Sequence, residues 1–411
     1  MSFNQYTWDL YKQTTIGIEM IKYFSDAGGY VLFKDYCPYA NFIPEDLYND
    51  WLENIYCYGV SDYDHPSLLE EAKDLYISLI TLGIRVEGQQ WLPANDFKNM
   101  LGIIQPMSYV LSQFAPEYFF PYLFLCRIFE LNKIADFFNI DLPNIPKRTD
   151  YKGRCMYYWE LCEVFYLFRK ENGLSPADLW SFLYDFAPNN LPSEKIDMPK
   201  PSQVWFIGGR LYQEDKSLES KFWQSSPETK KGDILVHYET SPISAITCIE
   251  ISLTDGVIDP LFRYYGCIYI GNRINIPHIT LKELQTDEYF FKHPLVRKNF
   301  QGVNGWSVNS ENYSELLRMI KTKGFDIEVL PKLYAPTLPK DVIIEYEHDV
   351  EQQLLEPLLN SMGWYENKDF IRQLPIQAGR GHRIFPDYAL HYGNKPNEER
   401  AKVLIEAKLC M

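Results

Sequence analysis

The sequence predicts a multidomain α+β protein with a helical N-terminal region, a small β-barrel and a C-terminal α/β domain. Three patterns support this fold class: helical apolar spacing over residues 1–195, short strand-like runs after a proline-rich segment, and a helix followed by two apolar strands near the end. At 411 residues, the chain has room for about two to four domains. Its hydrophobic content of 46% is well above that of disordered chains, so most of it should fold.

The first region, residues 1–195, contains three helix signals. Residues 116–131 are almost continuously apolar, which predicts a buried helix. Residues 157–173 show amphipathic spacing and end at a glycine, and Ser175 with Pro176 then forms an N-terminal cap for another helix. This order is compatible with a DNA-reading helix-turn-helix and equally with the connection in any helical bundle.

A second domain is expected over residues 201–325, after a proline-rich linker at 192–202. Short β-rich runs bounded by turn residues predict four strands, at 204–209, 232–238, 245–251 and 264–270. Strands of this length and spacing are typical of a small barrel.

The motifs of this second domain also occur in a recognisable order. They are Phe222-Trp223-Gln224, the 231–238 strand, Asp259-Pro260, residues 277–281 and residues 294–302. Over residues 201–320 this order resembles EVE-like domains of the PUA superfamily, which implies a reader of modified bases.

A base that is flipped out of the duplex needs stacking faces and polar edges around it. The candidates for these contacts in the EVE-like domain are aromatic and amide side chains, namely Trp205, Trp223, Gln224 and Asn299. Core packing is the alternative role for each tryptophan.

Near the end of the chain, two short apolar strands carry acidic residues. Asp387 lies within 385–390, and Glu406 lies within 403–408. Two carboxylates on neighbouring strands can hold one hard divalent cation, so we expect Asp387 and Glu406 to bind Mg²⁺ or Mn²⁺. Lys408 lies two residues beyond Glu406 on the same strand face, where its ammonium could stabilise a phosphate transition state.

The longer C-terminal pattern, residues 335–411, adds a helix that begins near Glu347 and ends at Gly363, and a Gly-Arg-Gly-His-Arg turn at 379–383. From about residue 341, it resembles the PD-(D/E)XK nuclease domain of type I restriction subunits. The resemblance implies that Asp387, Glu406 and Lys408 are catalytic and that a helix glutamate supports the metal.

Glu351 matches the position of this helix glutamate best, and Glu347, one turn earlier, is the alternative. In the turn before the acid strand, Arg380 and Arg383 are suited to contact phosphates.

Members of this superfamily normally continue past the lysine into a helix and another strand, whereas the chain stops at Met411. We therefore expect a fragment of a longer protein, a domain completed by a further C-terminal region or a partner, or a degenerate nuclease. Many such nucleases cut two strands as dimers, so a homodimer is a further expectation.

Composition limits the other function classes. A net charge of −15 excludes a protein that coats nucleic acid with a generally basic surface, although a local basic cleft remains compatible with it. The eight cysteines include no Cys-X-X-Cys pair, and the sequence has neither a signal peptide nor a long apolar span, which predicts a reduced, cytoplasmic protein without membrane contact.

Taken together, the sequence predicts a Mg²⁺- or Mn²⁺-dependent DNA endonuclease, a hydrolase of modification-dependent restriction or phage defence. Two alternatives stay open. The first is a non-catalytic nucleic-acid-binding scaffold with a degenerate nuclease fold, and the second is an RNA-directed nuclease, because a PUA-type pocket can also bind RNA.

Overall fold

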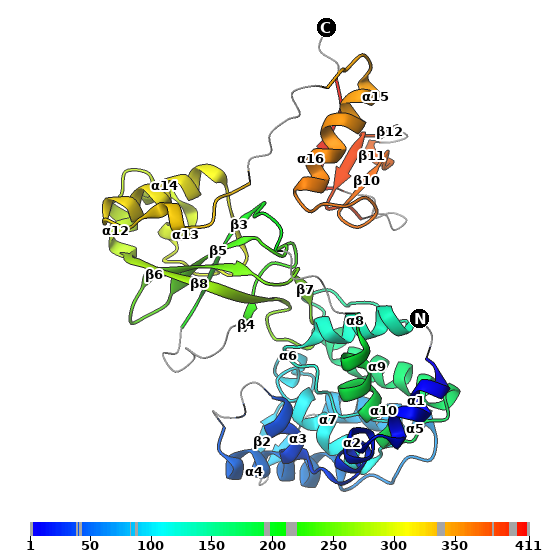
Figure 1. Ribbon diagram of the computed structural model, residues 1–411. Coiled ribbons are helices and arrows are strands. Elements are labelled where there is room, and N and C mark those ends of the chain that lie inside the picture. The colour runs from blue at the N-terminus through cyan, green and yellow to red at the C-terminus, as the bar shows by residue number, and fades with distance from the viewer. Residues whose placement is uncertain are drawn as a thin grey trace. The chain divides into compact units, whose positions relative to one another are not determined.

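The computed structural model describes residues 3–37, 40, 43–82, 84–86, 89–192, 198–210, 220–334, 342–379, 382–393 and 401–408. The chain divides into two compact units (Figure 1), Met1–Lys195 with Val257–Cys267, and Ile196–Gly256 with Ile268–Met411. The protein is mixed α/β, with many helices and one curled β-sheet that forms a half-barrel. The predicted α+β class is confirmed at this level, and the finer assignment of domains stays a prediction.

The first unit is mainly helical. Its helices are α1 (Gln5–Gln13), α2 (Thr15–Asp26), α3 (Gly29–Tyr36), α4 (Glu45–Ile55), α5 (Leu69–Leu82), α6 (Phe97–Met100), α7 (Ile104–Phe114), α8 (Ile128–Phe138), α9 (Tyr151–Glu171), α10 (Pro176–Ser181) and α11 (Ala187–Asn190). Two π-helical turns extend α4 and α10, namely η2 (Tyr56–Val60) and η3 (Phe182–Phe186). A short hairpin of β1 (Ile84–Val86) and β2 (Gln89–Leu92) completes the unit.

The predicted helix ends around α9 and α10 are confirmed. Gly173, with a φ of 62°, follows α9 in the left-handed region that glycine adopts without strain. The Ser175 hydroxyl accepts a hydrogen bond from the backbone N–H of Asp178, and the Asp178 carboxylate accepts one from the backbone N–H of Ser175. Together they form a capping box. Leu179 and Trp180 of α10 are 4% and 6% exposed, so both side chains are buried in the core. A DNA-reading role of α10 stays a prediction.

The predicted helix over 116–131 is wrong for most of its length, because residues 115–127 form turns and irregular chain and α8 begins only at Ile128. The segment is nevertheless buried, as its apolar composition implies. Its backbone groups bond to side chains instead of to a helical ladder. The Tyr158 hydroxyl donates to the carbonyl of Phe120 at 2.7 Å, and the Ser108 hydroxyl accepts from the backbone N–H of Tyr122 at 2.8 Å.

The 257–267 segment packs with the helical unit although the sequence places it between strands of the sheet. Arg154 of α9 is 1% exposed, and its guanidinium donates to the carbonyls of Pro260 at 2.8 Å and Phe262 at 2.7 Å. It also donates to the carbonyl of Arg148 at 3.0 Å. These bonds compensate for the burial of a charged group and hold the segment to α9.

The second unit is built on the half-barrel sheet. The strands of this sheet are β3 (Val204–Gly209), β4 (Ser220–Gln224), β5 (Ile234–Glu239), β6 (Ala245–Ser252), β7 (Val257–Ile258), β8 (Gly266–Thr280) and β9 (Trp306–Val308). Of these, β7 and the first two residues of β8 belong to the first unit. The strand order is β4-β8-β6-β5-β3-β9, with β3 and β5 parallel and β7 paired to β8. All four predicted strands are confirmed. The predicted small barrel is present as a half-barrel, since the described strands leave β4 and β9 as the two edges of a curled sheet.

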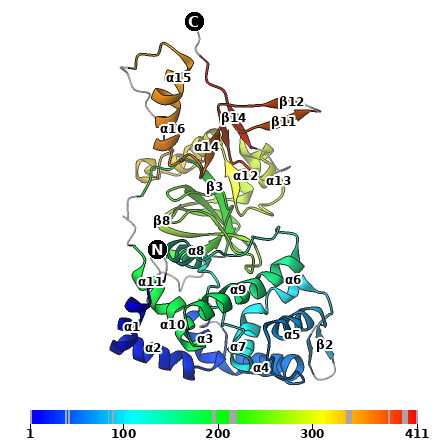
Figure 2. The ribbon, with the colours of Figure 1, turned by 90° about the vertical axis from the view of Figure 1, so that its right-hand side faces the viewer.

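The two faces of the half-barrel have different cores. One face packs against α12 (Leu281–Thr286), α13 (Pro294–Arg297) and α14 (Ser310–Thr322), which Figure 2 shows beside the sheet. Short 3₁₀ turns at Phe290–Lys292 and Ile327–Val329 connect this helical layer. The other face holds a smaller cluster of Trp205, Ile207, Leu235, Ile268 and Ile270.

The C-terminal part of the second unit begins with one continuous helix, made of α15 (Glu347–Val350), the π-helical η7 (Glu351–Leu355) and α16 (Glu356–Ser361). Gly363, with a φ of 79°, follows its end as predicted. A three-stranded antiparallel sheet has the order β10-β13-β14, from β10 (Phe370–Arg372), β13 (Tyr388–Leu390) and β14 (Val403–Ile405). The hairpin of β11 (Ile376–Gly379) and β12 (His382–Ile384) stands beside it.

The core of this part joins Leu359 of α16 to Phe370, Tyr388 and Leu390 of the sheet. On β14, Val403 and Leu404 are 44% and 46% exposed. Among the helices of the described ranges, none has both the length and the hydropathy needed to cross a membrane.

Candidate metal centre and nucleic-acid contacts

Asp387 and Glu406 lie at the same end of two paired strands. Tyr388 of β13 is opposite Ile405 of β14, so Asp387, just before β13, faces Glu406, just after β14. The Asp387 Oδ2 accepts a hydrogen bond from the backbone N–H of Ala407 at 2.7 Å. This contact places the acid strand directly beside the Glu-X-Lys sequence.

The second Asp387 oxygen, Oδ1, accepts a hydrogen bond from the Gln373 amide at 3.1 Å. Gln373 follows β10 and has a φ of 53°, and its backbone N–H bonds to the carbonyl of Pro386 at 3.1 Å. With one donor on each oxygen, the carboxylate of Asp387 has a fixed orientation, and each oxygen keeps a second lone pair for a cation.

Lys408 lies beside both acids. Its Nζ is 3.3 Å from Oε1 of Glu406, and these two side chains are 65% and 56% exposed. The pKa of Lys408 is raised by Glu406 first, then by Glu347 and Asp387. The four residues thus share one electrostatic environment in which the lysine keeps its charge.

Glu351 is engaged elsewhere. Its carboxylate forms a short ion pair with the guanidinium of Arg372 on β10, and the same guanidinium donates to Glu356 at 2.7 Å. The structure therefore groups Glu347, rather than Glu351, with Lys408.

Of the two predicted phosphate contacts, Arg380 lies outside the described residues. Arg383 is on β12, opposite Gln377 of β11, and its side chain is exposed. Its position on an exposed hairpin is compatible with contact to a phosphate backbone.

In the half-barrel, Trp205 is 5% exposed and belongs to the smaller core cluster. Its Nε1 donates to Asp233 at 2.9 Å. The same carboxylate accepts from the Ser202 hydroxyl at 3.1 Å and from the backbone N–H groups of Gln203 at 3.1 Å and Lys230 at 2.9 Å. In this conformation Trp205 therefore packs in the core, which is the alternative to contact with a base.

Trp223 is half-buried and packs against the same cluster. Its ring lies edge to face with His237, at 4.8 Å between centroids, and its Nε1 donates to Asn304 at 3.3 Å. A Cβ on Gly209 would lie 2.5 Å from this ring, so a glycine is required where the indole crosses β3. Gln224, next on β4, is also half-buried.

Asn299 lies on the side of the half-barrel that faces the helices, whereas Trp223 lies on the other face. Asn299 follows α13, has a φ of 50°, and accepts from the Gln285 amide of α12 at 2.9 Å. Its neighbour Phe300 packs in the core beneath the helices, whereas Trp223 packs against the cluster on the other face of the sheet. The predicted reader residues therefore divide between the two faces of the half-barrel.

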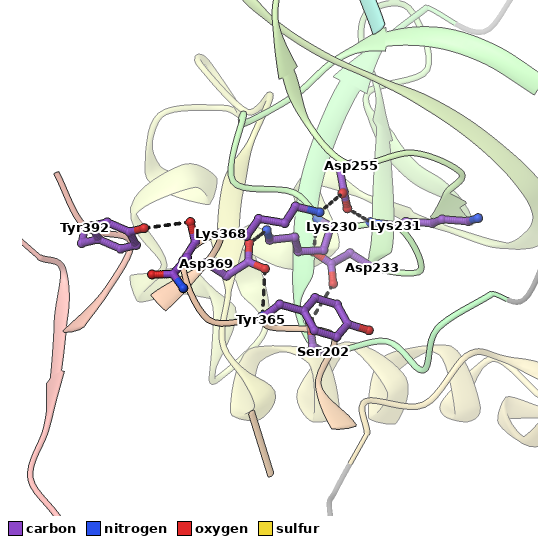
Figure 3. Close-up of polar contacts among 10 residues, drawn as sticks. Ser202, Lys230, Lys231, Asp233, Asp255, Tyr365, Lys368, Asp369 and Tyr392 are labelled. Atoms are coloured by element: carbon purple, nitrogen blue, oxygen red, sulfur yellow. Dashed lines mark hydrogen bonds and ion pairs between the residues drawn. The ribbon is translucent and has the colours of Figure 1, made fainter. Parts of the chain in front are cut away.

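Ion pairs also join loops within the second unit, as Figure 3 shows. Lys230 forms a short ion pair with Asp369, and Lys368 lies 3.1 Å from Asp255. Asp369 also accepts from the backbone N–H of Tyr365 at 3.1 Å, which fixes its orientation. The acids here already have cationic or backbone partners, so this cluster is structural.

Sequence reasoning missed Gln373, Arg372 and the Ala407 backbone N–H. Each acts through a tertiary contact whose partner lies between 14 and 21 residues away, and none carries a residue type that signals metal chemistry.

No family model and no curated protein matches the chain. Among solved structures, it is similar to Rpa0253 from Rhodopseudomonas palustris, with 13% identity and a TM-score of 0.26 over 29% of this chain and 94% of that one. It is also similar to Atu2648 from Agrobacterium tumefaciens, with 18% identity and a TM-score of 0.25 over 29% and 92%. A hypothetical protein from Leishmania major gives 11% identity and a TM-score of 0.25 over 30% and 98%. Likenesses of this size carry no argument about the chain.

Proposed function

We propose that this chain is a metal-dependent DNA endonuclease whose C-terminal part is of the PD-(D/E)XK kind and whose EVE-like half-barrel selects modified DNA. The observation that carries the proposal is the hydrogen bond from the Ala407 N–H to Asp387. It brings an acid, a second acid and a lysine to one strand end, the arrangement that phosphodiester hydrolysis with a metal requires.

The donor set fits a hard divalent cation. Asp387 and Glu406 would hold Mg²⁺ or Mn²⁺ through carboxylate oxygens, and Glu406 is exposed enough to turn toward an ion. When bound, the metal would supply Lewis-acid stabilisation of the phosphate and a more acidic water.

The chain's own residues would orient the metal-binding carboxylate, stabilise the charge on the phosphate and contact the DNA. Gln373 and the Ala407 N–H keep the Asp387 carboxylate oriented. Lys408, whose ammonium lies 3.3 Å from Glu406, would stabilise negative charge on the scissile phosphate or hold the attacking water. The exposed Arg383 would contact the DNA backbone.

The test is cleavage of plain, cytosine-methylated and hydroxymethylated DNA by the full chain, with Mg²⁺ or Mn²⁺, beside Lys408→Ala. The matched control is Lys332→Ala, because the Lys332 side chain is 64% exposed and that of Lys408 is 65% exposed. We expect wild type and Lys332→Ala to cleave modified DNA and Lys408→Ala to lose roughly 10²–10³-fold in rate, the usual loss when one charge-stabilising donor is removed.

The other outcomes select among the alternatives. Binding of modified DNA without cleavage would support the non-catalytic scaffold. Faster cleavage of single-stranded RNA would support the RNA-directed nuclease. Equal cleavage by wild type and Lys408→Ala would refute the assigned site.

A further inference from the structure

A second group of metal-ligating side chains lies inside the half-barrel. His237 of β5 pairs directly with Cys248 of β6, and Glu250 is two residues further along β6, so all three point to the same face of the sheet. They are 0%, 0% and 2% exposed, respectively. One ligand atom from each lies within 4.8 Å of the others.

These separations are close to those of a tetrahedral site. With metal–ligand bonds of about 2.0–2.3 Å, ligand atoms lie about 3.3–3.8 Å apart. His237 Nδ1 and Glu250 Oε2 are already 3.0 Å apart. Small side-chain rotations would bring all three ligand atoms around one ion.

The surroundings supply two further features of a metal site. The other oxygen of Glu250, Oε1, accepts from Arg273 at 2.8 Å, which orients the carboxylate as outer hydrogen bonds orient metal ligands. The edge of the Trp223 ring packs against the His237 imidazole, with 4.8 Å between the ring centroids, and helps to fix the orientation of that ligand.

We propose that His237, Cys248 and Glu250 bind a Zn²⁺ ion that stabilises the half-barrel, with a water or another small ligand as the fourth donor. A thiolate, an imidazole and a carboxylate together suit zinc, whereas Mg²⁺ prefers oxygen ligands only. As the ion binds, the Cys248 thiol releases its proton to solvent, and the His237 ring proton that Nδ1 donates to Glu250 moves to Nε2, which frees Nδ1 for the metal. This site is independent of the proposed nuclease activity.

The experiment strips the full chain with a chelator and reloads it with Zn²⁺ or Co²⁺. We expect about one zinc ion per chain, a rise in melting temperature, and, with Co²⁺, the near-ultraviolet charge-transfer band that only a thiolate ligand produces. Cys248→Ser and His237→Gln should lose the zinc.

Two variants serve as controls. Cys267→Ser changes another buried cysteine, 1% exposed and on β8, and should keep both metal and band. Asp387→Ala should also keep them, which separates this site from the acids of the C-terminal sheet. If Cys248→Ser or His237→Gln does not fold, the wild-type Co²⁺ spectrum still tests the proposal, because a spectrum without the thiolate band would overturn it, and a band that persists in Cys267→Ser would support it.

Either of two results would overturn the proposal. One is folded wild-type protein that shows no thiolate band at saturating Co²⁺. The other is equal loss of zinc in Cys248→Ser and Cys267→Ser, which would mean that destabilisation, rather than a missing ligand, explains the loss.

Discussion

At the scale of single residues, the two helix glutamates have different surroundings. Glu351 shares Arg372 with Glu356, so its charge is balanced within the fold. Glu347 raises the pKa of Lys408, so its charge acts on the candidate catalytic lysine. On this ground we favour Glu347 as the acid that supports the proposed centre.

Glu347→Gln should therefore lower metal-dependent cleavage with little change in stability. The effect should be only a few-fold in rate, because solvent screens the action of this charge on an exposed ammonium. Glu351→Gln should instead lower the free energy of unfolding, by about 1 kcal/mol after allowance for solvent screening of a partly exposed pair.

Cleavage rates and urea denaturation of both variants distinguish these roles. A larger loss of cleavage in Glu351→Gln, at unchanged stability, would return the supporting role to Glu351.

The residue scale also shows where prediction from sequence succeeds. Asp387, Glu406 and Lys408 lie near one another, but Asp387 precedes β13 and the other two residues follow β14, which ends at Ile405. The pairing of the two strands, rather than the periodicity of one strand, brings them together. Trp205 could not be assigned in this way. Its commitment to Asp233 depends on a partner 28 residues away, which periodicity does not specify.

At the scale of elements, the sequence predicts well the helices that have capping residues and the short strands. Ser175 and Gly173 mark the ends of their helices because local hydrogen bonds and backbone conformation decide them. The 115–127 segment shows the limit. Its continuous apolar run implies burial, but it does not show the 3.6-residue spacing that would distinguish a helix from other buried chain. In addition, Pro121 lacks the backbone N–H that a helix needs. Its actual partners, such as the hydroxyl of Tyr158, are tertiary.

The α12 cap gives a pH-dependent prediction. Burial raises the pKa of Glu283, but the Lys323 ammonium and the Thr280 donors outweigh it and hold the pKa at about 2. Because the folded-state pKa is below the unfolded one, this carboxylate stabilises the fold above about pH 4.5, and the contribution is lost as the pH falls towards 2.

Glu283→Gln should accordingly be less stable than wild type near neutral pH, and the difference should shrink below about pH 4. The side chain is 40% exposed, so solvent screening limits the effect to about 1 kcal/mol. Urea denaturation over this pH range measures it, with Glu311→Gln in α14 as the control for removal of a surface charge. A constant difference across the range would contradict the assignment.

At the scale of the whole molecule, the two compact units do not follow the order of the sequence. Residues 257–267 leave the sheet after β6, join the helical unit and return through β8. The first unit therefore consists of two stretches of sequence, one that ends at Lys195 and one that runs from Val257 to Cys267. The composition of the 257–267 segment does not indicate to which unit it belongs. Its contact to the first unit depends on Arg154, which lies more than a hundred residues away in the sequence.

Arg154→Ala should destabilise the first unit by about 2–4 kcal/mol, because several buried carbonyls would lose their donor at once. Arg148→Ala is the matched control, since that side chain is exposed and only its backbone carbonyl takes part. Thermal unfolding of the full chain measures the difference. Equal melting temperatures for the two variants would show that the guanidinium contributes nothing to stability.

The path of the 257–267 segment also has a consequence for fragments of this protein. If the peptide chain were cut between residues 192 and 198, the first fragment would still hold Val257–Cys267 of the second through the Arg154 guanidinium and the bond from the Tyr265 hydroxyl to the Pro146 carbonyl, 2.6 Å long. The two pieces should therefore elute together under native conditions and separate only in denaturant. The helical fragment expressed without that segment should lose the carbonyl partners of the buried Arg154 guanidinium and be less stable than the same fragment in the cut protein.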